Sequence, residues 1–264
     1  AEASFTTAIR LQPDLAPAHA NLCGILNAQK RYVAGEAAGR RAVELAPEAP
    51  IAWCNLASAL IGGKRFAEAE AACRKALELD RNLPEAWGNL GQALAEQFRL
   101  GEAEAAYTTA LTLDPGMASL HSGLAKVFLE KGDVAQAAEE LGKALAKDAN
   151  DPEILSHQLF CLNYLPNLPA SDMLPIARRY GDVVRAGVTA FDSWQCSPDP
   201  ARKLRVGLVS GDLRRHPVGY LLRGPLRKIT RAEFELFAYS NFPQEDDLSA
   251  ELRQHCAAWT VVNE

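Results

Sequence analysis

A 34-residue repeat fills the first part of the chain and constrains its fold more than any other feature. The strings AIRLQPD, AVELAPE, ALELDRN, ALTLDPG and ALAKDAN begin at Ala8, Ala42, Ala76, Ala110 and Ala144, each 34 residues after the last. Periods of about 20 to 50 residues are typical of arrays in which each repeat is one supersecondary unit. The sequence therefore predicts stacked copies of a single unit.

Matching positions of the repeats share one pattern of residue size. We number the full repeats from Ala16, Pro50, Pro84 and Ala118. The fourth position is His or Trp, the seventh is Leu, and the eighth is small in every repeat, as Cys23, Ala57, Gly91 and Ala125. These positions share one helical stripe, which a single hairpin cannot bury alone. The pattern resembles tetratricopeptide repeats. We expect such an α-superhelix over residues 1–151, with a partial repeat at 1–15.

Asparagine recurs at the sixth position as Asn21, Asn55 and Asn89, and Gly123 interrupts the series. A lone asparagine suits a helix edge at little cost, but side chains at one repeat position line one face of the array. An amide offers a donor and an acceptor to the backbone of a peptide. We therefore expect the three asparagines to bind peptides. The hypothesis is wrong if replacing all three with alanine leaves binding unchanged.

The repeat pattern fails after Asp151. DPEILSHQLFCLNYL still predicts a helix, although Gln158 stands where the repeats have leucine, so this segment is a closing helix or a junction. A helical pattern then covers Met173 to Val184, and VTAFDSWQCSPDPARK is rich in turn residues. We expect a helical junction and linker over residues 152–200.

Residues 201–264 alternate between strand and helix patterns. LRVGLVS (204–210) and EFELFAYSN (233–241) predict strands, whereas VGYLLRGPLRKI (218–229) and DLSAELRQHCAAW (247–259) predict helices. This alternation is typical of a doubly wound parallel α/β sheet. Because two strands make no stable sheet of this kind, we expect the beginning of a Rossmann-like domain whose remainder lies outside the chain.

The loop after Ser210 lies beyond the carboxyl end of a predicted strand, where such sheets bind ligands. Gly211 gives the backbone freedom, and Asp212 and His216 could supply a carboxylate and an imidazole for proton transfer. Nine Lys or Arg residues against one acidic residue between positions 200 and 231 would suit a phosphate-bearing ligand. Other interpretations stay open: His216 as a loop residue bonded to backbone, Asp212 as a cap, and the arginines as a solvated helix face.

Composition excludes several classes of protein. The formal net charge of −5 argues against a general nucleic-acid binder. No apolar run approaches the roughly 18 residues of a membrane span, and we expect a cytoplasmic protein. The cysteines lack CxxC pairs and histidines at ligand spacing, so we expect reduced, mostly buried thiols and no metal site. They are Cys23, Cys54, Cys73, Cys161, Cys196 and Cys256.

The order of the motifs carries a more specific resemblance. Repeats with asparagine at position six, the junction FCLNYLPNLPA, and then LRVGLVSGDLRRHPVGYLL and FELFAYSN together resemble the nucleocytoplasmic O-linked N-acetylglucosamine transferases, especially their bacterial SPINDLY-like members. The resemblance spans essentially the whole chain. It implies a GT-B-type catalytic unit of two Rossmann-like lobes, a UDP-linked sugar donor, inversion at the anomeric carbon and no required metal or other cofactor. It also implies acceptor proteins threaded along the repeats.

The same resemblance implies roles for individual residues. His216 matches an active-site histidine that acts as a base or as an orienting group, and Asp212 matches the carboxylate at the start of its loop. Asn21, Asn55 and Asn89 match the series that holds the acceptor backbone. The donor-binding lobe would lie beyond Glu264, so we expect this chain to be a fragment that transfers no sugar by itself.

Two functions stay open on the sequence. The parent protein could transfer N-acetylglucosamine, or another activated hexose, to Ser or Thr hydroxyl groups of acceptor proteins. Alternatively, the repeats could form a non-catalytic protein-interaction scaffold, which could also assemble oligomers. The sequence does not distinguish the donor sugar, the acceptors, or oxygen-linked from nitrogen-linked transfer.

Overall fold

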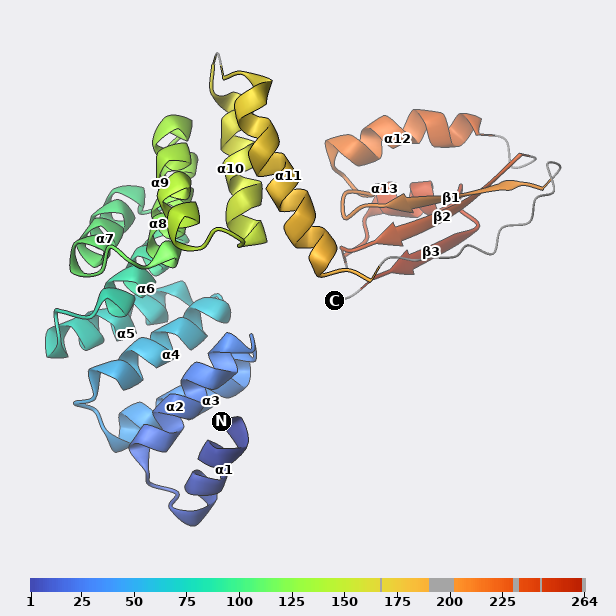
Figure 1. The fold of residues 1–264 in the computed structure, drawn as a ribbon. Helices are drawn as coiled ribbons and strands as arrows, with labels where there is room; N and C mark the ends of the chain where they lie inside the picture. The colour runs from blue at the N-terminus through green and yellow to red at the C-terminus, as the bar shows by residue number, and fades with distance from the viewer. Residues whose placement is uncertain (167, 190–201, 230–232, 243, 263–264) are drawn as a thin grey trace. The chain divides into compact units, whose positions relative to one another are not determined.

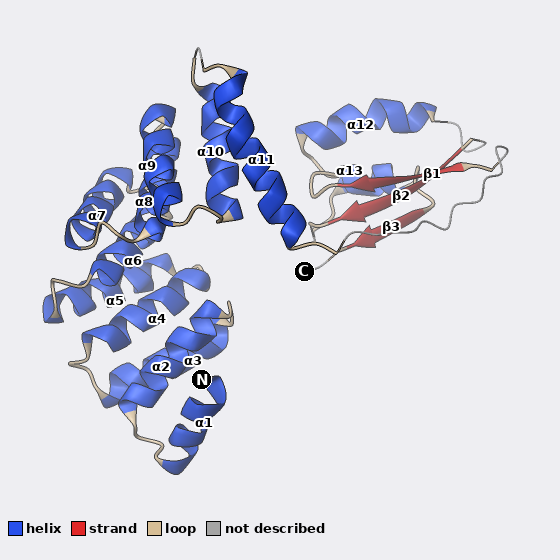
Figure 2. Cartoon of the chain, in the orientation of Figure 1, coloured by secondary structure: helices blue, strands red, loops and turns tan. Residues whose placement is uncertain are grey.

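The computed structural model describes residues 1–166, 168–189, 202–229, 233–242 and 244–262. It divides into two compact units, Ala1–Thr189 and Ala190–Glu264, which are described separately below. Among the described residues, the first unit consists of helices and connecting loops, and the strands belong to the second (Figure 2). The predicted domain boundaries at residues 151 and 201 stay predictions.

The first unit is a row of helices joined by short turns (Figure 1). They are α1 (Glu2–Leu11), α2 (Ala16–Ala28), α3 (Tyr32–Leu45), α4 (Pro50–Gly62), α5 (Phe66–Leu79), α6 (Pro84–Ala95), α7 (Leu100–Leu113), α8 (Ala118–Glu130), α9 (Val134–Lys147), α10 (Pro152–Tyr164) and α11 (Ala170–Ala186). The pairs α2 with α3, α4 with α5, α6 with α7 and α8 with α9 form hairpins. We call α2, α4, α6, α8 and α10 the A helices. Successive A helices from α2 to α8 also pack against each other, which confirms the predicted stacking.

Small residues let neighbouring hairpins approach closely. A Cβ atom at Gly88 would lie 2.5 Å from Cδ2 of Leu120 in the next repeat. Cys23, Cys54, Cys73 and Cys161 are free and buried, as predicted. Burial raises the pKa of the Cys23 thiol to about 11, which keeps it protonated and unreactive near neutral pH. Cys196 lies outside the described residues.

In three of the four full repeats, the fourth residue fastens an A helix to the turn before it. The ring nitrogens of Trp53 and Trp87 donate to backbone carbonyls six residues earlier, at 2.8 and 2.9 Å, and Nε2 of His19 makes the equivalent contact. His121 departs from this pattern, because its Nδ1 lies 2.7 Å from Oε2 of the buried Glu140. The Trp and His side chains at this position all form hydrogen bonds through a ring nitrogen.

Ion pairs between repeats begin from carboxylates that follow the 34-residue period. Each joins a carboxylate on the second helix of one hairpin, or on α1, to a cation at the turn of the next hairpin. The pairs are Glu2 with Arg31, Glu36 with Arg65, Glu70 with Arg99 and Glu104 with Lys131. These contacts link consecutive repeats along the outside of the array.

The second unit is a parallel sheet of order β1, β2, β3, with β1 at Leu204–Val209, β2 at Phe234–Ser240 and β3 at Ala258–Val261. Helix α12 (Pro217–Lys228) connects β1 to β2, and α13 (Asp247–Arg253) connects β2 to β3. The two helices contact each other, and one apolar cluster joins them to Leu236 and Ala238 of β2. Both helices therefore cover the same face of the sheet. Among the described residues, no helix packs on the other face, where Val209 and Tyr239 are exposed.

The predicted α/β character is confirmed, with one correction. We predicted a helix over 247–259, but α13 ends at Arg253 and the last part of that segment enters β3. The register pairs Phe237 with Ala258 and Tyr239 with Thr260. Pairing with β2 therefore outweighs the helical pattern at the end of this segment.

Candidate functional site

The asparagines of the sixth position lie on consecutive A helices, and two of them tie those helices together. Nδ2 of Asn55 donates to the carbonyl of Ala20 at 2.9 Å, and Nδ2 of Asn89 donates to the carbonyl of Cys54 at 3.2 Å. Asn21 is exposed on α2. Among the described residues, none bonds to Oδ1 of Asn55 or Asn89. The amides therefore have a structural role that the sequence did not reveal, and their oxygens stay available to a ligand.

Tyr107 on α7 explains why the asparagine series stops at Gly123. A Cβ atom at Gly123 would lie 2.5 Å from the Tyr107 ring, and one at Gly91 would lie 2.9 Å from it. Tyr107 is buried at position 24 of its repeat, where Cys73 stands one repeat earlier. A large residue at position 24 therefore requires glycine at two facing positions. The interruption results from packing.

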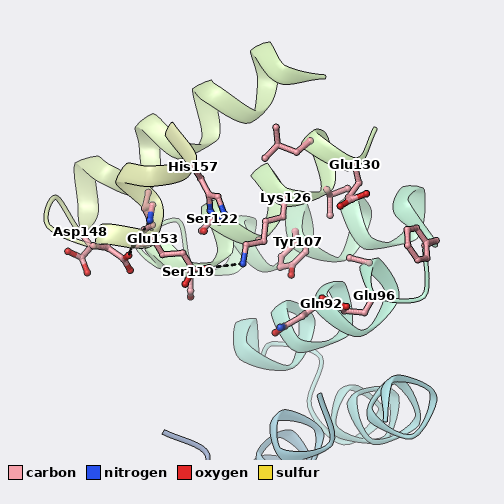
Figure 3. A pocket seen from close by; sticks show the side chains of 18 residues that line it. Gln92, Glu96, Tyr107, Ser119, Ser122, Lys126, Glu130, Asp148, Glu153 and His157 are labelled. Atoms are coloured by element: carbon pink, nitrogen blue, oxygen red, sulfur yellow. Dashed lines mark hydrogen bonds and ion pairs between the residues drawn. The ribbon is translucent and has the colours of Figure 1, made fainter. Parts of the chain in front are cut away.

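A hollow of about 660 Å³ lies beside the interrupted position (Figure 3). Its lining comes mainly from the A helices α6, α8 and α10, and includes Gln92, Ser122 and Gly123. Gly123 stands at position six, the position that the asparagines occupy in the earlier repeats. The hollow therefore continues the face on which the asparagines lie. We call this face, from α2 to α10, the A-helix groove.

The hollow carries more carboxylates than cations. Glu96, Glu130, Asp148, Asp151 and Glu153 line it, and Lys126 is its single lysine or arginine among the described residues. Nζ of Lys126 lies 2.9 Å from Oε1 of Glu153, and this ammonium group holds the pKa of Glu153 below its ordinary value. Asp151 caps α10 by accepting the backbone N–H groups of Glu153 and Ile154. The hollow is therefore negatively charged near neutral pH.

Most of these lining residues were not predicted from the sequence. Gln92 and Lys126 stand at position 9 of their repeats, and Glu96 and Glu130 stand at position 13. Positions 6, 9 and 13 share one face of a helix, so helical periodicity could have found them. The asparagines drew attention because they are identical, whereas these side chains vary between repeats.

The loop after β1 lies at the carboxyl end of the sheet, as predicted. Asp212 N–H donates to Oγ of Ser210 at 3.0 Å. Gly211 lies close to Asn241, which follows β2, because a Cβ atom at Gly211 would lie 2.6 Å from Oδ1 of that side chain. The loop is therefore held against the segment that follows the neighbouring strand.

His216 is the N-cap residue of α12. Its Nδ1 accepts the backbone N–H of Val218 at 3.3 Å. Asp212 and His216 are partly exposed, and Oδ2 of Asp212 lies 3.7 Å from the same Nδ1. That distance is too long for a hydrogen bond. The structure brings the two side chains near each other, and the roles predicted for them stay predictions.

Several of the basic residues near this loop are already paired. Arg215 forms two hydrogen bonds with Asp247, Arg223 and Arg227 share Glu251, and Arg205 lies near Glu235. The guanidinium group of Arg214 stacks on the Phe242 ring at 3.8 Å. The local excess of positive charge is therefore smaller than the sequence suggested.

Comparison with protein families decides the nature of the first unit. The tetratricopeptide-repeat family matches residues 50–83 and 94–157. The first unit is a tetratricopeptide-repeat array. Such arrays are protein-interaction scaffolds that typically bind peptide or protein partners, and this chain is a tetratricopeptide-repeat protein. Among curated protein sequences, none matches the chain.

Solved structures resemble the tetratricopeptide-repeat protein to different extents. A mutant of the Thermobaculum terrenum O-GlcNAc transferase is 30% identical with a TM-score of 0.59, over 81% of this chain and 41% of that enzyme. Pseudomonas aeruginosa PilF is 25% identical with a TM-score of 0.54, over 67% of this chain and 78% of PilF. A tetratricopeptide-repeat protein of Thermus thermophilus shares the fold at 21% identity, with a TM-score of 0.53, over 64% of this chain and 99% of that one. The chain spans less than half the length of the transferase.

Membrane spans and metal sites are not found among the described residues. No described helix is long and apolar enough to cross a membrane. No three or more His, Cys, Asp or Glu side chains gather into a metal site within the described part of the chain.

Proposed function

We propose that the A-helix groove binds extended segments of acceptor proteins. The supporting observation is geometric: Oδ1 atoms of Asn55 and Asn89 lie on one face, each without a described partner, and a hollow of about 660 Å³ continues that face. An amide oxygen accepts a backbone N–H from any residue type, so such contacts favour binding without strong sequence choice.

We further propose that the groove serves a glycosyltransferase. A protein containing this chain and a donor-binding lobe would transfer N-acetylglucosamine from a UDP-sugar to Ser or Thr of the bound protein. The single observation that carries this proposal is the 30% identity to an O-GlcNAc transferase over 81% of this chain. Because the chain spans 41% of that enzyme, the activity is proposed for the larger protein and not for these residues alone.

The geometry of His216 favours a hydrogen-bond donor over a base. A neutral imidazole has one donor nitrogen and one acceptor nitrogen. Because Nδ1 accepts the Val218 N–H, the proton of the neutral ring lies on Nε2. The ring would then donate from Nε2 to an oxygen of the donor sugar, its diphosphate or the acceptor, and a second group or water would take the hydroxyl proton.

Sugar transfer by the full-length protein tests the proposal. Radiolabelled UDP-N-acetylglucosamine and an acceptor protein should give labelled acceptor, and His216→Ala should lower the rate about 100-fold. His216→Gln keeps a donor and loses any base, so it should retain more activity than the alanine variant. His255→Ala, in the same unit but outside this loop, is the matched control. Wild-type rates in folded His216→Ala would remove the role proposed for this residue.

A non-catalytic scaffold is the second candidate. It is favoured by the match of the tetratricopeptide-repeat family to residues 50–83 and 94–157. The same assay separates the two: a full-length protein that binds acceptor peptides and transfers no sugar from any UDP-hexose is a scaffold.

A further inference from the structure

The A-helix groove ends at α10 in a second hollow of about 590 Å³, which is lined mainly by apolar residues. Leu129, Glu130 and His157 line both this hollow and the larger one beside it. The two hollows are therefore one continuous surface. A peptide lying along the A helices would pass from one into the other.

Aromatic side chains are exposed at this end of the groove. Phe160 and Tyr164 on α10 are 51% and 64% exposed, and their ring centroids lie 4.9 Å apart. They occupy positions 9 and 13, which Ser58 and Gly62 fill on α4. Large apolar side chains that gather on an open surface commonly mark a binding site. The groove therefore changes from polar to aromatic toward its C-terminal end.

Phe98 is a third exposed ring, and it lines the larger hollow beside the one that Phe160 and Tyr164 line. It is 79% exposed and adopts a positive φ of 58° in the turn after α6. The equivalent turn residues are Lys30, Lys64 and Gly132, which also have positive φ. A bulky residue is uncommon in this conformation, and glycine adopts it without strain. Because the Phe98 ring is exposed, packing in the core does not explain why a phenylalanine stands in this turn.

Charge decides what this end of the groove would bind. Glu96 and Glu130 stand at position 13 of consecutive repeats, and no described residue forms an ion pair with either. The one lysine that lines the hollow among the described residues, Lys126, has its ammonium group turned toward Glu153, away from Glu96 and Glu130 (Figure 3). An anionic segment would be repelled here, whereas a cation would gain two carboxylates and the faces of aromatic rings.

We propose that the Glu96, Phe98 and Glu130 end of the groove selects peptides that carry an arginine or lysine side chain. The cation lies between the two carboxylates, and the apolar stem of its side chain packs on the exposed rings. This inference rests on the proposed binding of peptides by the groove. It adds a preference that the asparagine amides cannot supply, because they would contact only the backbone.

A pair of labelled peptides tests the proposal with the whole chain. One is a ten-residue peptide of Ser, Thr and Val with a central arginine, and the other has citrulline in its place, which keeps the shape and removes the charge. Fluorescence anisotropy at low salt should show roughly fivefold to tenfold tighter binding of the arginine peptide. The difference should shrink as salt screens the charges. Equal affinities in wild type would overturn the proposal.

Matched variants locate the preference. Glu96→Gln with Glu130→Gln should abolish it, whereas Glu44→Gln with Glu48→Gln, which makes the same change in net charge outside the hollow, should leave it intact. Phe98→Gly should weaken binding of the arginine peptide without lowering the stability of the protein, since glycine adopts the positive φ of this turn without strain. Lys64→Gly is its control in the preceding repeat. Unchanged discrimination in the Glu96 and Glu130 double variant would place the cation elsewhere and contradict the proposal.

The same titration separates this inference from the proposed function. If both peptides bind equally and the triple alanine variant of Asn21, Asn55 and Asn89 weakens both, the groove binds peptides and the cation preference is wrong. If neither peptide binds, both proposals fail.

Discussion

At the scale of residues, a single large side chain alters the face that would contact a peptide. Tyr107 fills space that Gly91 and Gly123 leave open, and a Cβ atom at either glycine would come within 3 Å of its ring. The glycine at position six is therefore required by the tyrosine one helix earlier. Tyr107 and Gly123 both line the larger hollow.

The packing of Tyr107 against Gly123 predicts the effect of a larger residue at position 123. Gly123→Ala should lower the free energy of unfolding by about 1 to 3 kcal/mol, because the added methyl group must displace the Tyr107 ring. Gly142→Ala is the control: this helical glycine has nothing within 4 Å of an added Cβ, so alanine should raise stability by about 0.5 to 1 kcal/mol. Chemical denaturation measures both. Equal stabilities of the two variants would show that the ring moves aside freely.

The asparagines should differ from one another in stability. Asn55→Ala and Asn89→Ala each remove a hydrogen bond to the preceding A helix and should cost about 1 kcal/mol of unfolding free energy. Asn21→Ala removes no described hydrogen bond and should cost little. Thermal unfolding of the three single variants checks this order, and identical losses would contradict it. Asn21→Ala is thus the cleanest probe of binding.

The sequence predicted the position of these asparagines but not their hydrogen bonds. A 34-residue period places residues on a face, whereas a bond between Asn55 and the carbonyl of Ala20 depends on the offset between two helices. That offset is set by small residues throughout the interface. For the same reason, the position of His216 was predictable and its bond to Val218 was not.

At the scale of elements, periodicity predicted nearly every helix of the first unit. The repeat pattern occurs often enough that a single departure, such as Gln158, does not obscure it. Gln158 is buried on α10 although the other repeats have leucine at this position. The second unit has no internal repeat against which a doubtful segment can be compared, and β3 was not predicted. Only four residues form β3, and although Trp259, Thr260 and Val261 favour strands, so short a segment depends on pairing with β2.

Contacts between elements predict loss of stability in acid. The side chain of Glu70 is 14% exposed, and although burial raises its pKa, hydrogen bonds from Arg74, Gln97 and Arg99 outweigh burial and hold the pKa below the ordinary 4.5. A carboxylate with a lowered pKa stabilises the folded state above its unfolded pKa, and this contribution is lost as pH falls through the folded value.

Denaturation at pH 7 and pH 3 tests this point. Glu70→Gln should cost about 1 kcal/mol at pH 7 and should lose less stability than wild type on going to pH 3. Glu78→Gln, at a side chain that is 67% exposed, should behave as wild type. If all three proteins lose the same stability in acid, the ion pairs between repeats do not contribute as described.

At the scale of the whole molecule, the described residues combine a tetratricopeptide-repeat array with a three-stranded parallel sheet and its two connecting helices. The fold of both units followed from sequence pattern, because a repeat and a strand-helix alternation are global signals. The function of the array follows from its family, whereas the proposed chemistry depends on an enzyme of which this chain spans 41%. The central claim is therefore that the A-helix groove is the surface that binds peptides.

Photo-crosslinking measures this claim most directly. A peptide that carries a photoreactive phenylalanine analogue is irradiated with the whole chain, and the modified residues are identified by mass spectrometry. The account predicts adducts on the A helices, chiefly on α4, α6 and α8, which an excess of unlabelled peptide suppresses. Adducts confined to the second helices of the hairpins, α5, α7 and α9, would contradict it.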